Sequence, residues 1–305
     1  MKIIRAGVLG FCSGVRRAVD LAYEEAERSK GQRPVYTLGP LMHNPPALEE
    51  LQRRGITILA EKHLPQNLHG ACVIIRAHGI SPQMEADLRE RGAAVIDATC
   101  PRVKASQRQA AAFAAAGYRL FLAGEELHAE IIGIRGYAGT AVFAVVGSAA
   151  EAEKAAAQLH AKLPNAKTAL IGQTTISAEE YHAIGEAITP FFPNLEIAQT
   201  ICAATRERQD SLRELLDVVD AVIIVGGKES ANTRRLVSIA EAAGKPCALV
   251  EKPADIPPDF FKFNTIGLAA GASTPDTVVD AISANLNPNS SHGGHGVYGG
   301  HGAVV

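Results

Sequence analysis

The sequence predicts an α/β fold of three pseudo-repeated units, each built on a parallel sheet, arranged around one central site. Two observations carry this prediction. Short apolar runs alternate with longer helical segments, the order expected when parallel strands are covered by helices. In addition, an apolar run leading into a cysteine and then a helix occurs three times, at Cys12, Cys100 and Cys202, which lie 88 and 102 residues apart. This recurrence indicates an internal repeat whose cysteines meet at one point.

The first unit is expected over residues 1–99 and includes the N-terminal strand and Cys12. Gly55 is placed to end its second helix, while Ser81 and Pro82 form a favourable start for its third. The patterns predict strands at 3–11, 34–38, 56–59, 71–75 and 94–99, and helices at 15–28, 46–54 and 82–91.

The second unit, residues 100–200, and the third unit, residues 201–286, repeat this order. Ser177 with Glu180 forms a capping box for a helix of the second unit. In the second unit the patterns predict strands at 118–122, 141–146, 168–171 and 195–201, and helices at 101–116 and 178–188. In the third unit they predict strands at 221–225, 247–250 and 265–268, and helices at 206–219, 232–243 and 276–286. Residues 287–305 are rich in Gly and His and are expected to form a disordered tail.

The composition fits an ordinary soluble α/β protein. Of the 305 residues, 47% are apolar and 20% are charged, and the net charge is −2. This balance gives no sign of a nucleic-acid or membrane partner, and we expect neither. No apolar segment approaches membrane-spanning length. The odd number of cysteines, five, and the absence of a CxxC pair indicate a reducing compartment, so we expect a cytoplasmic location.

Polar side chains follow the predicted strand ends in every unit, where open parallel sheets bind their ligands. Histidine, serine and asparagine at such positions are suited to hold a phosphate or diphosphate. Glu130, two residues after His128, is placed to donate a proton. Ser230 and Ser273 are equally suited to cap helices. The candidates are His43, His78, His128, Glu130, Thr174, Ser230, Asn232 and Ser273.

The cysteines divide into two groups. Cys72 and Cys247 lie within predicted strands and are interpreted as buried apolar side chains. Cys12, Cys100 and Cys202 lie at helix starts, where the helix dipole favours the metal-binding thiolate. Three thiolates without a fourth protein ligand indicate either an iron–sulfur cluster or a zinc ion with one open position. The sequence therefore predicts a central metal site that is able to bind substrate directly.

Short motifs spread over about residues 3 to 285 give the chain a specific family resemblance. It resembles the LytB-type 4-hydroxy-3-methylbut-2-enyl diphosphate reductases, iron–sulfur enzymes that complete the methylerythritol phosphate route to isoprenoids. The motifs that carry the resemblance are Gly10-Phe11-Cys12-Ser13-Gly14-Val15, His43-Asn44, Ala77-His78-Gly79, Asp97-Ala98-Thr99-Cys100-Pro101, His128 with Glu130, Gln173-Thr174-Thr175-Ile176-Ser177, Ile201-Cys202 with Thr205 and Arg208-Gln209, Ser230 with Asn232, and Gly271-Ala272-Ser273 with Pro275-Asp276.

The resemblance implies one [4Fe–4S] cluster per chain, held by Cys12, Cys100 and Cys202, with an open iron for the substrate hydroxyl. It also implies that Thr174 orients this hydroxyl and that Glu130 supplies protons. Reduced ferredoxin or flavodoxin would deliver two electrons singly, and the products would be isopentenyl and dimethylallyl diphosphate. The implied diphosphate-binding residues are His43, His78, His128, Ser230, Asn232 and Ser273.

Three positions depart from the pattern that the resemblance leads us to expect. Ala129 stands where the family usually has proline, a change expected to loosen that loop. Ala231 stands where the family often has serine, so one hydroxyl group is lost from the third unit. Glu229 adds a negative charge beside the proposed anion site, and we expect its side chain to point outward.

Two other functions are weighed against the reductase. A non-catalytic iron–sulfur electron carrier or redox sensor needs the cysteines but has no use for the polar residues at the strand ends. A zinc-dependent phosphohydrolase would use both sets of residues and would carry one zinc per chain. Tight diphosphate binding argues against the carrier, and a brown, iron-containing protein argues against the hydrolase.

Overall fold

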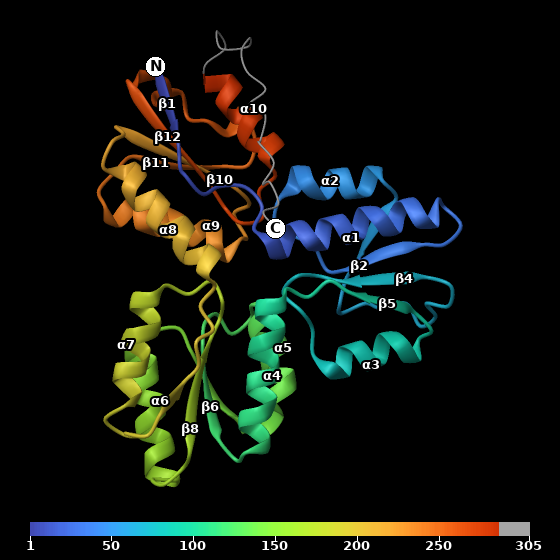
Figure 1. The fold of residues 1–305 in the computed structure, drawn as a ribbon, viewed down its shortest axis with the longest axis vertical. Coiled ribbons are helices and arrows are strands. Elements are labelled where there is room, and N and C mark those ends of the chain that lie inside the picture. The colour runs from blue at the N-terminus through green and yellow to red at the C-terminus, as the bar shows by residue number, and fades with distance from the viewer. Residues whose placement is uncertain (287–305) are drawn as a thin grey trace, which may run out of the picture.

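Three lobes surround a common centre in the computed structural model, which describes residues 1–286 (Figure 1). Each lobe contains a four-stranded sheet in which all paired strands are parallel. This arrangement confirms the predicted fold class. The predicted tail, 287–305, lies outside the described residues.

The same strand order recurs in every sheet. In the first lobe the order is β3 (Ile56–Leu59), β2 (Val35–Leu38), β4 (Cys72–Ile75) and β5 (Ala94–Asp97). In the second lobe it is β7 (Val142–Val146), β6 (Arg119–Ala123), β8 (Thr168–Gly172) and β9 (Glu196–Ile197). In the third lobe it is β11 (Cys247–Val250), β10 (Ala221–Val225), β12 (Thr265–Ala270) and β1 (Lys2–Arg5).

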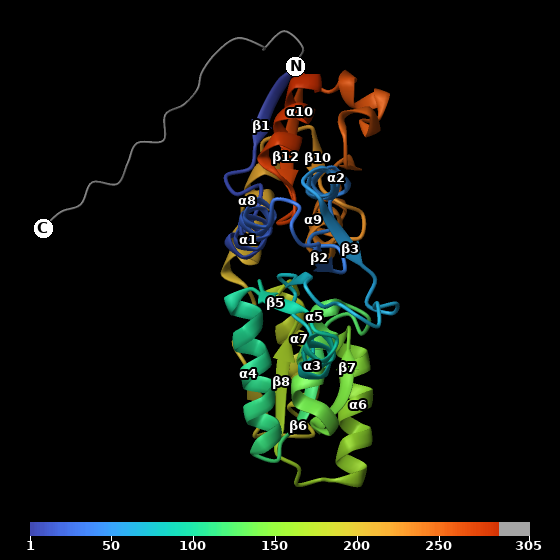
Figure 2. The same ribbon diagram turned by 90° about the vertical axis from the view of Figure 1, so that its right-hand side faces the viewer.

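Helices cover both faces of each sheet, and apolar clusters fill the space between (Figures 1 and 2). In the first lobe, α1 (Ser13–Ser29) and α2 (Pro45–Arg53) pack opposite α3 (Pro82–Glu90). In the second, α4 (Pro101–Ala115) and α5 (Ala129–Ala138) pack opposite α6 (Ala149–Lys162) and α7 (Ala178–Ile188). In the third, α8 (Ala203–Leu216) and α9 (Ala231–Ala242) pack opposite α10 (Asp276–Leu286). Within residues 1–286, no helix is both long and apolar enough to cross a membrane.

The N-terminal strand corrects one part of the sequence prediction. We expected it in the first unit, 1–99, but β1 pairs with β12 in the third sheet, with Ile3 beside Ile266. It occupies the edge position that β5 and β9 fill in the other two sheets. The third unit supplies only three strands of its own from residues 201–286, so its β12 edge would otherwise remain unpaired. The third sheet therefore obtains its fourth strand from the N-terminal end of the chain.

The cysteine junctions form as the sequence predicts. Cys12, Cys100 and Cys202 are the N-cap residues of α1, α4 and α8, and each helix begins at the next residue. Helices α5 and α6 were not among the predicted elements. Helix α5 contains two glycines, Gly133 and Gly136, and lacks a clear apolar stripe, whereas the Ala-rich α6 has the high intrinsic propensity that would have identified it.

Candidate functional site

One pocket collects all of the predicted site residues. It lies where the lobes meet, at the carboxyl ends of the strands, as expected for open parallel sheets. Its lining includes Cys12, His43, His78, Cys100, His128, Glu130, Thr174, Cys202, Ser230, Asn232 and Ser273. The individual roles of these residues remain predictions, but their convergence from three lobes is a property of the fold.

The repeat gives these residues equivalent positions. The edge strands β1, β5 and β9 lead to Cys12, Cys100 and Cys202, and each of these cysteines precedes a helix. The strands β2, β6 and β10 lead to His43, to His128 with Glu130, and to Ser230 with Asn232. The strands β4, β8 and β12 lead to His78, Thr174 and Ser273. The pocket therefore combines one ring of thiols with two sets of polar groups.

The thiols are packed against a position that tolerates only glycine. A Cβ atom on Gly14 would lie 2.7 Å from Sγ of Cys100 and 3.9 Å from Sγ of Cys12, so a larger residue would fill the space beside both thiols. Burial raises the pKa of Cys100, an effect that the backbone N–H groups of Arg102 and Val103 oppose. Within residues 1–286, no three His, Cys, Asp or Glu side chains converge closely enough to bind a single metal ion.

This donor set fits an iron–sulfur cluster. The three candidate donors are thiols, the kind of ligand that holds such clusters, and all three are half-buried at helix N-termini. The glycine at position 14 keeps the space beside Cys12 and Cys100 free of side-chain atoms.

The three histidines form a row with His78 at its middle. The ring centroid of His78 lies 5.8 Å from that of His43 and 5.2 Å from that of His128. Burial lowers the pKa of all three, well below the usual value for His78 and to about 4 for His128. The rings are therefore neutral near pH 7 in the free protein. His128 caps α5, because its Nδ1 accepts a hydrogen bond from the backbone N–H of Glu130 at 3.2 Å.

Asn232 is a buried side chain with unused hydrogen-bonding capacity. It is 4% exposed, it lines the pocket, and neither its amide nitrogen nor its amide oxygen has a partner. Nδ1 of His78 is also buried without a partner. Ser230 caps α9, since its hydroxyl oxygen accepts from the backbone N–H of Thr233 at 3.3 Å. Unpaired buried polar groups are costly, so these atoms are poised for a ligand.

Glu130 and Thr174 form a buried pair. The backbone N–H of Thr174 donates to Oε1 of Glu130, and its hydroxyl donates to Oε2, both at 2.8 Å. Glu130 is only 1% exposed, and burial raises its pKa to about 7, although both hydrogen bonds oppose this increase. A carboxyl group with such a pKa both holds and releases a proton near neutral pH.

Comparison with known proteins identifies the family. A family model described as LytB protein matches residues 3–287. The chain belongs to the LytB family. The 4-hydroxy-3-methylbut-2-enyl diphosphate reductase of Treponema pallidum is 44% identical, with 93% of this chain and 83% of the relative covered. The protein of the same name from Treponema denticola is 42% identical, with coverages of 94% and 99%.

A solved structure supports the same assignment. The E-1-hydroxy-2-methyl-but-2-enyl-4-diphosphate reductase from Plasmodium falciparum superimposes with a TM-score of 0.84 at 28% identity. The match covers 95% of this chain and 89% of that chain. The family resemblance inferred from the sequence motifs is thus confirmed.

The three departures from the expected LytB pattern lie at or just before helix starts. Ala129 is the first residue of α5, where proline would also fit, and the preceding cap by His128 holds the loop in place. Ala231 is the first residue of α9. Glu229 is exposed, in agreement with our expectation that it points outward, although its charge still reaches the imidazole of His43 and favours the protonated form.

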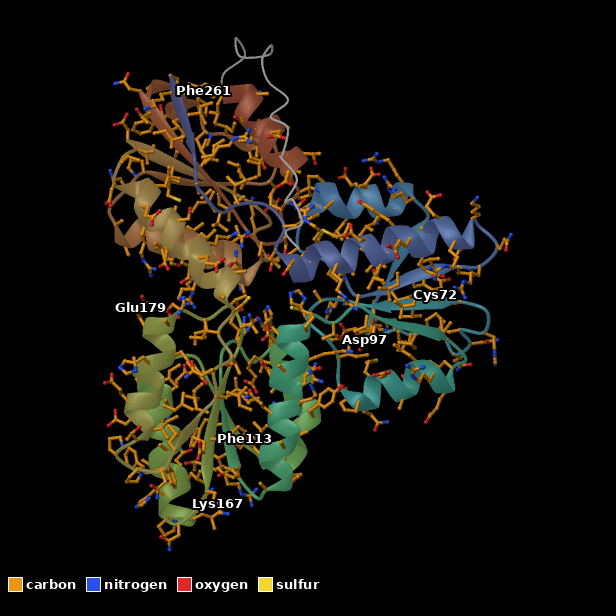
Figure 3. All side chains as sticks on the ribbon, in the orientation of Figure 1. Cys72, Asp97, Phe113, Lys167, Glu179 and Phe261 are labelled. Atoms are coloured by element: carbon orange, nitrogen blue, oxygen red, sulfur yellow. The ribbon has the colours of Figure 1, made fainter. Side chains whose placement is uncertain are left out.

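One buried cation near the LytB pocket was missed. Arg76 is 9% exposed, forms an ion pair with Glu61, and lowers the pKa of His43, His78 and His128 through its charge. A basic residue directly after a buried strand was the available signal. Of the two cysteines interpreted as buried apolar side chains, Cys72 is fully buried, as predicted, whereas Cys247 is only partly buried. Burial raises the pKa of each thiol to about 11. Cys72 lies within the first lobe, away from the centre (Figure 3).

Proposed function

We propose that this LytB-family protein reductively removes the hydroxyl group of (E)-4-hydroxy-3-methylbut-2-enyl diphosphate, giving isopentenyl diphosphate and dimethylallyl diphosphate. The names of its relatives support this reaction. The observation that carries the proposal is one pocket in which three thiols face a Glu130–Thr174 pair and a buried, unpartnered Asn232. A redox metal site, a proton source and an anion site are the parts that this reaction needs.

Cys12, Cys100 and Cys202 would hold one [4Fe–4S] cluster per chain, because their thiols line the pocket and start three helices whose dipoles favour thiolate. When bound, the cluster supplies an iron with an open position for the substrate hydroxyl and passes on the electrons that the reaction consumes. Gly14 keeps side-chain atoms out of the space beside Cys12 and Cys100.

The diphosphate binds among groups from all three lobes, including His128 of the second lobe. His43 and His78 are neutral in the free site and gain protons beside an anion, so they become charged donors on binding. The free amide of Asn232 donates to a phosphate oxygen without giving up an internal hydrogen bond. Ser230 and Ser273 add hydroxyl groups from the third lobe.

Glu130 supplies protons through Thr174. In the free site the Thr174 hydroxyl donates to Glu130. When Glu130 is protonated, its carboxyl O–H donates to the Thr174 oxygen instead, and the Thr174 hydroxyl then donates to the substrate hydroxyl in the pocket. A pKa of about 7 leaves a large fraction of Glu130 protonated at neutral pH. That proton is available to the departing hydroxyl, which leaves as water. Burial of the pair keeps bulk solvent from competing for the proton.

The electrons come from a one-electron carrier, which we take to be reduced ferredoxin or flavodoxin. The protein works in the cytoplasm, an assignment supported by five cysteines that are all free. The reaction needs two electrons and two protons for each molecule of substrate, and water is the second product.

The test is anaerobic purification, followed by iron, sulfide and zinc analysis and by visible absorbance before and after addition of the allylic diphosphate. We expect a brown protein with about four irons per chain, an absorbance change on adding substrate, and two isomeric products with a chemical reductant. Zinc without iron would favour the phosphohydrolase. Iron with no response to substrate or pyrophosphate would favour the electron carrier.

A further inference from the structure

Arg208 is a buried cation without a carboxylate partner. It lies on α8 and is 2% exposed. Its Nη2 donates to the backbone carbonyl of Gly10 at 2.6 Å, and its Nη1 donates to that of Ala204 at 3.4 Å. Its Nε is buried without a partner. Within residues 1–286, no carboxylate forms an ion pair with this guanidinium, and the neighbouring Glu207 is exposed.

The contacts of Arg208 connect two of the cysteine junctions. Gly10 lies two residues before Cys12, and Ala204 lies two residues after Cys202. The ionisable side chains close enough to act on the guanidinium are those of Cys12, Cys202 and Glu207. The arginine therefore links the two chain segments that carry Cys12 and Cys202.

A buried charge needs an opposite charge. Arginine does not lose its proton in proteins, so Arg208 remains positive despite burial. An isolated buried ion is strongly unfavourable unless a counter-charge or several hydrogen bonds compensate it. Two carbonyl groups compensate only part of this cost. Negative charge on a cluster held by thiolates would supply the remaining compensation.

We propose that Arg208 is the positioning residue of the metal centre: it balances the negative charge of the thiolate-bound cluster and ties the Cys12 loop to the Cys202 helix. The proposal rests on the cluster assigned under the proposed function. It has a direct electrochemical consequence. Reduction adds one electron to the cluster, and a fixed positive charge nearby stabilises the reduced form more than the oxidised form. Arg208 therefore raises the reduction potential.

The test compares Arg208→Gln, which removes the charge, with Arg208→Lys, which keeps it. Arg206→Gln is the matched control, because Arg206 lies on the same helix but is exposed. Each cluster-loaded protein is titrated under anaerobic conditions and followed by visible absorbance. We expect Arg208→Gln to shift the ratio of reduced to oxidised cluster about tenfold toward the oxidised form, about 59 mV for one electron. The Lys variant and the Arg206 control should stay within about threefold of the wild type.

Cluster-free protein provides a second readout. Because the charge of Arg208 is not balanced there by a cluster, Arg208→Gln should lower the unfolding temperature less in the cluster-free protein than in the cluster-loaded protein. An unchanged potential in Arg208→Gln, or an equal shift in Arg206→Gln, overturns the proposal. If Arg208→Gln takes up no iron, the Lys variant decides: full iron loading supports the role of the charge, and failed loading overturns it. A wild type that binds no iron refutes the proposed cofactor itself, which separates the two failures.

Discussion

The carboxylate of Glu130 accepts two hydrogen bonds from Thr174, one from the backbone N–H and one from the hydroxyl, each 2.8 Å long. The two residues are 44 positions apart and follow different strands, β6 and β8. The pair fixes both side chains in the second lobe, while the thiols and the anion-binding groups come from all three lobes. The position of the proton source in the proposed reaction therefore depends on two neighbouring strands, β6 and β8, of a single sheet.

Removal of the Glu130 proton should abolish most turnover while leaving ligand binding intact. Glu130→Gln keeps the size of the side chain and one acceptor oxygen for the backbone N–H of Thr174, but its amide has no acidic proton to transfer. We expect turnover to fall by about 10²- to 10⁴-fold, the usual contribution of a positioned general acid. Iron content and pyrophosphate affinity, measured by elemental analysis and calorimetry, should stay near wild-type values.

Glu126→Gln is the control for this variant. Glu126 lies four residues earlier in the same loop region but is exposed. It should turn over substrate at the wild-type rate. Wild-type turnover in Glu130→Gln would remove the residue from the mechanism, and loss of the cluster would show that its role is structural.

Glu130 should also make the cluster-free protein less stable as the pH rises. Its pKa increases from 4.5 to about 7 on folding, so the folded state binds more protons than the unfolded state in this interval. The contribution of Glu130 to the free energy of unfolding therefore falls between about pH 4.5 and 7 and is constant above pH 7. Each pH unit costs about 1.4 kcal/mol, which gives roughly 3 kcal/mol in total.

The measurement has to isolate Glu130, since the buried histidines act in the opposite direction. Their pKa values are lowered on folding, so their contribution to stability is lost as the pH falls. Urea unfolding of the wild type and of Glu130→Gln at a series of pH values cancels this contribution in the difference. A difference that does not change between pH 4.5 and 7 would contradict the raised pKa.

The sequence predicted the site better than it predicted the closure of the fold. Cys12, Cys100 and Cys202 were found because a helix start leaves local signals, and the histidines were found because they lie in the loops that follow apolar runs. Such signals depend on near neighbours in the chain. The fold class follows from the same alternation of strands and helices.

Relationships between distant residues carry no such local signal. The pairing of β1 with β12 joins the two ends of the chain, and the hydrogen bond from Arg208 to Gly10 spans 198 positions. The bond between Thr174 and Glu130 is equally invisible, although each residue was selected individually. The sequence alone does not show the strand pairing and tertiary packing that bring these groups together.

Asn232 should contribute to affinity and not to stability. Because its amide has no partner in the free protein, Asn232→Ala should leave the free energy of unfolding unchanged or increase it. Pyrophosphate affinity should fall by about 10- to 100-fold, the value of a hydrogen bond to a charged group. Unfolding in urea and calorimetric titration measure the two effects separately.

Asn44 gives the matched contrast for Asn232. It is also a buried asparagine, but its side chain caps α2 by accepting from the backbone N–H of Ala47 at 3.1 Å. Asn44→Ala should therefore lose about 1 kcal/mol of stability. Equal destabilisation by both substitutions would mean that Asn232 has an internal partner, and its assignment to the anion site would fail.

Binding of an anion should draw protons into the site, and the histidines that receive them are identifiable. His43 and His78 are neutral near pH 7, and the buried Nδ1 of His78 has no partner. His128 differs, because its Nδ1 already accepts the N–H of Glu130 and protonation would break this cap. An anion raises the pKa of a nearby histidine, so protons are taken up on binding and affinity weakens as the pH rises.

Calorimetric titration with pyrophosphate at pH 7, in two buffers that differ in ionisation enthalpy, counts these protons. We expect uptake of about one proton by the wild type, beyond any taken up by pyrophosphate itself. His43→Asn and His78→Asn should each reduce this uptake. His128→Asn should retain it, because asparagine also caps a helix N-terminus. Equal loss in all three variants would mean that the row of rings titrates as one unit and that the cap on α5 opens when the anion binds.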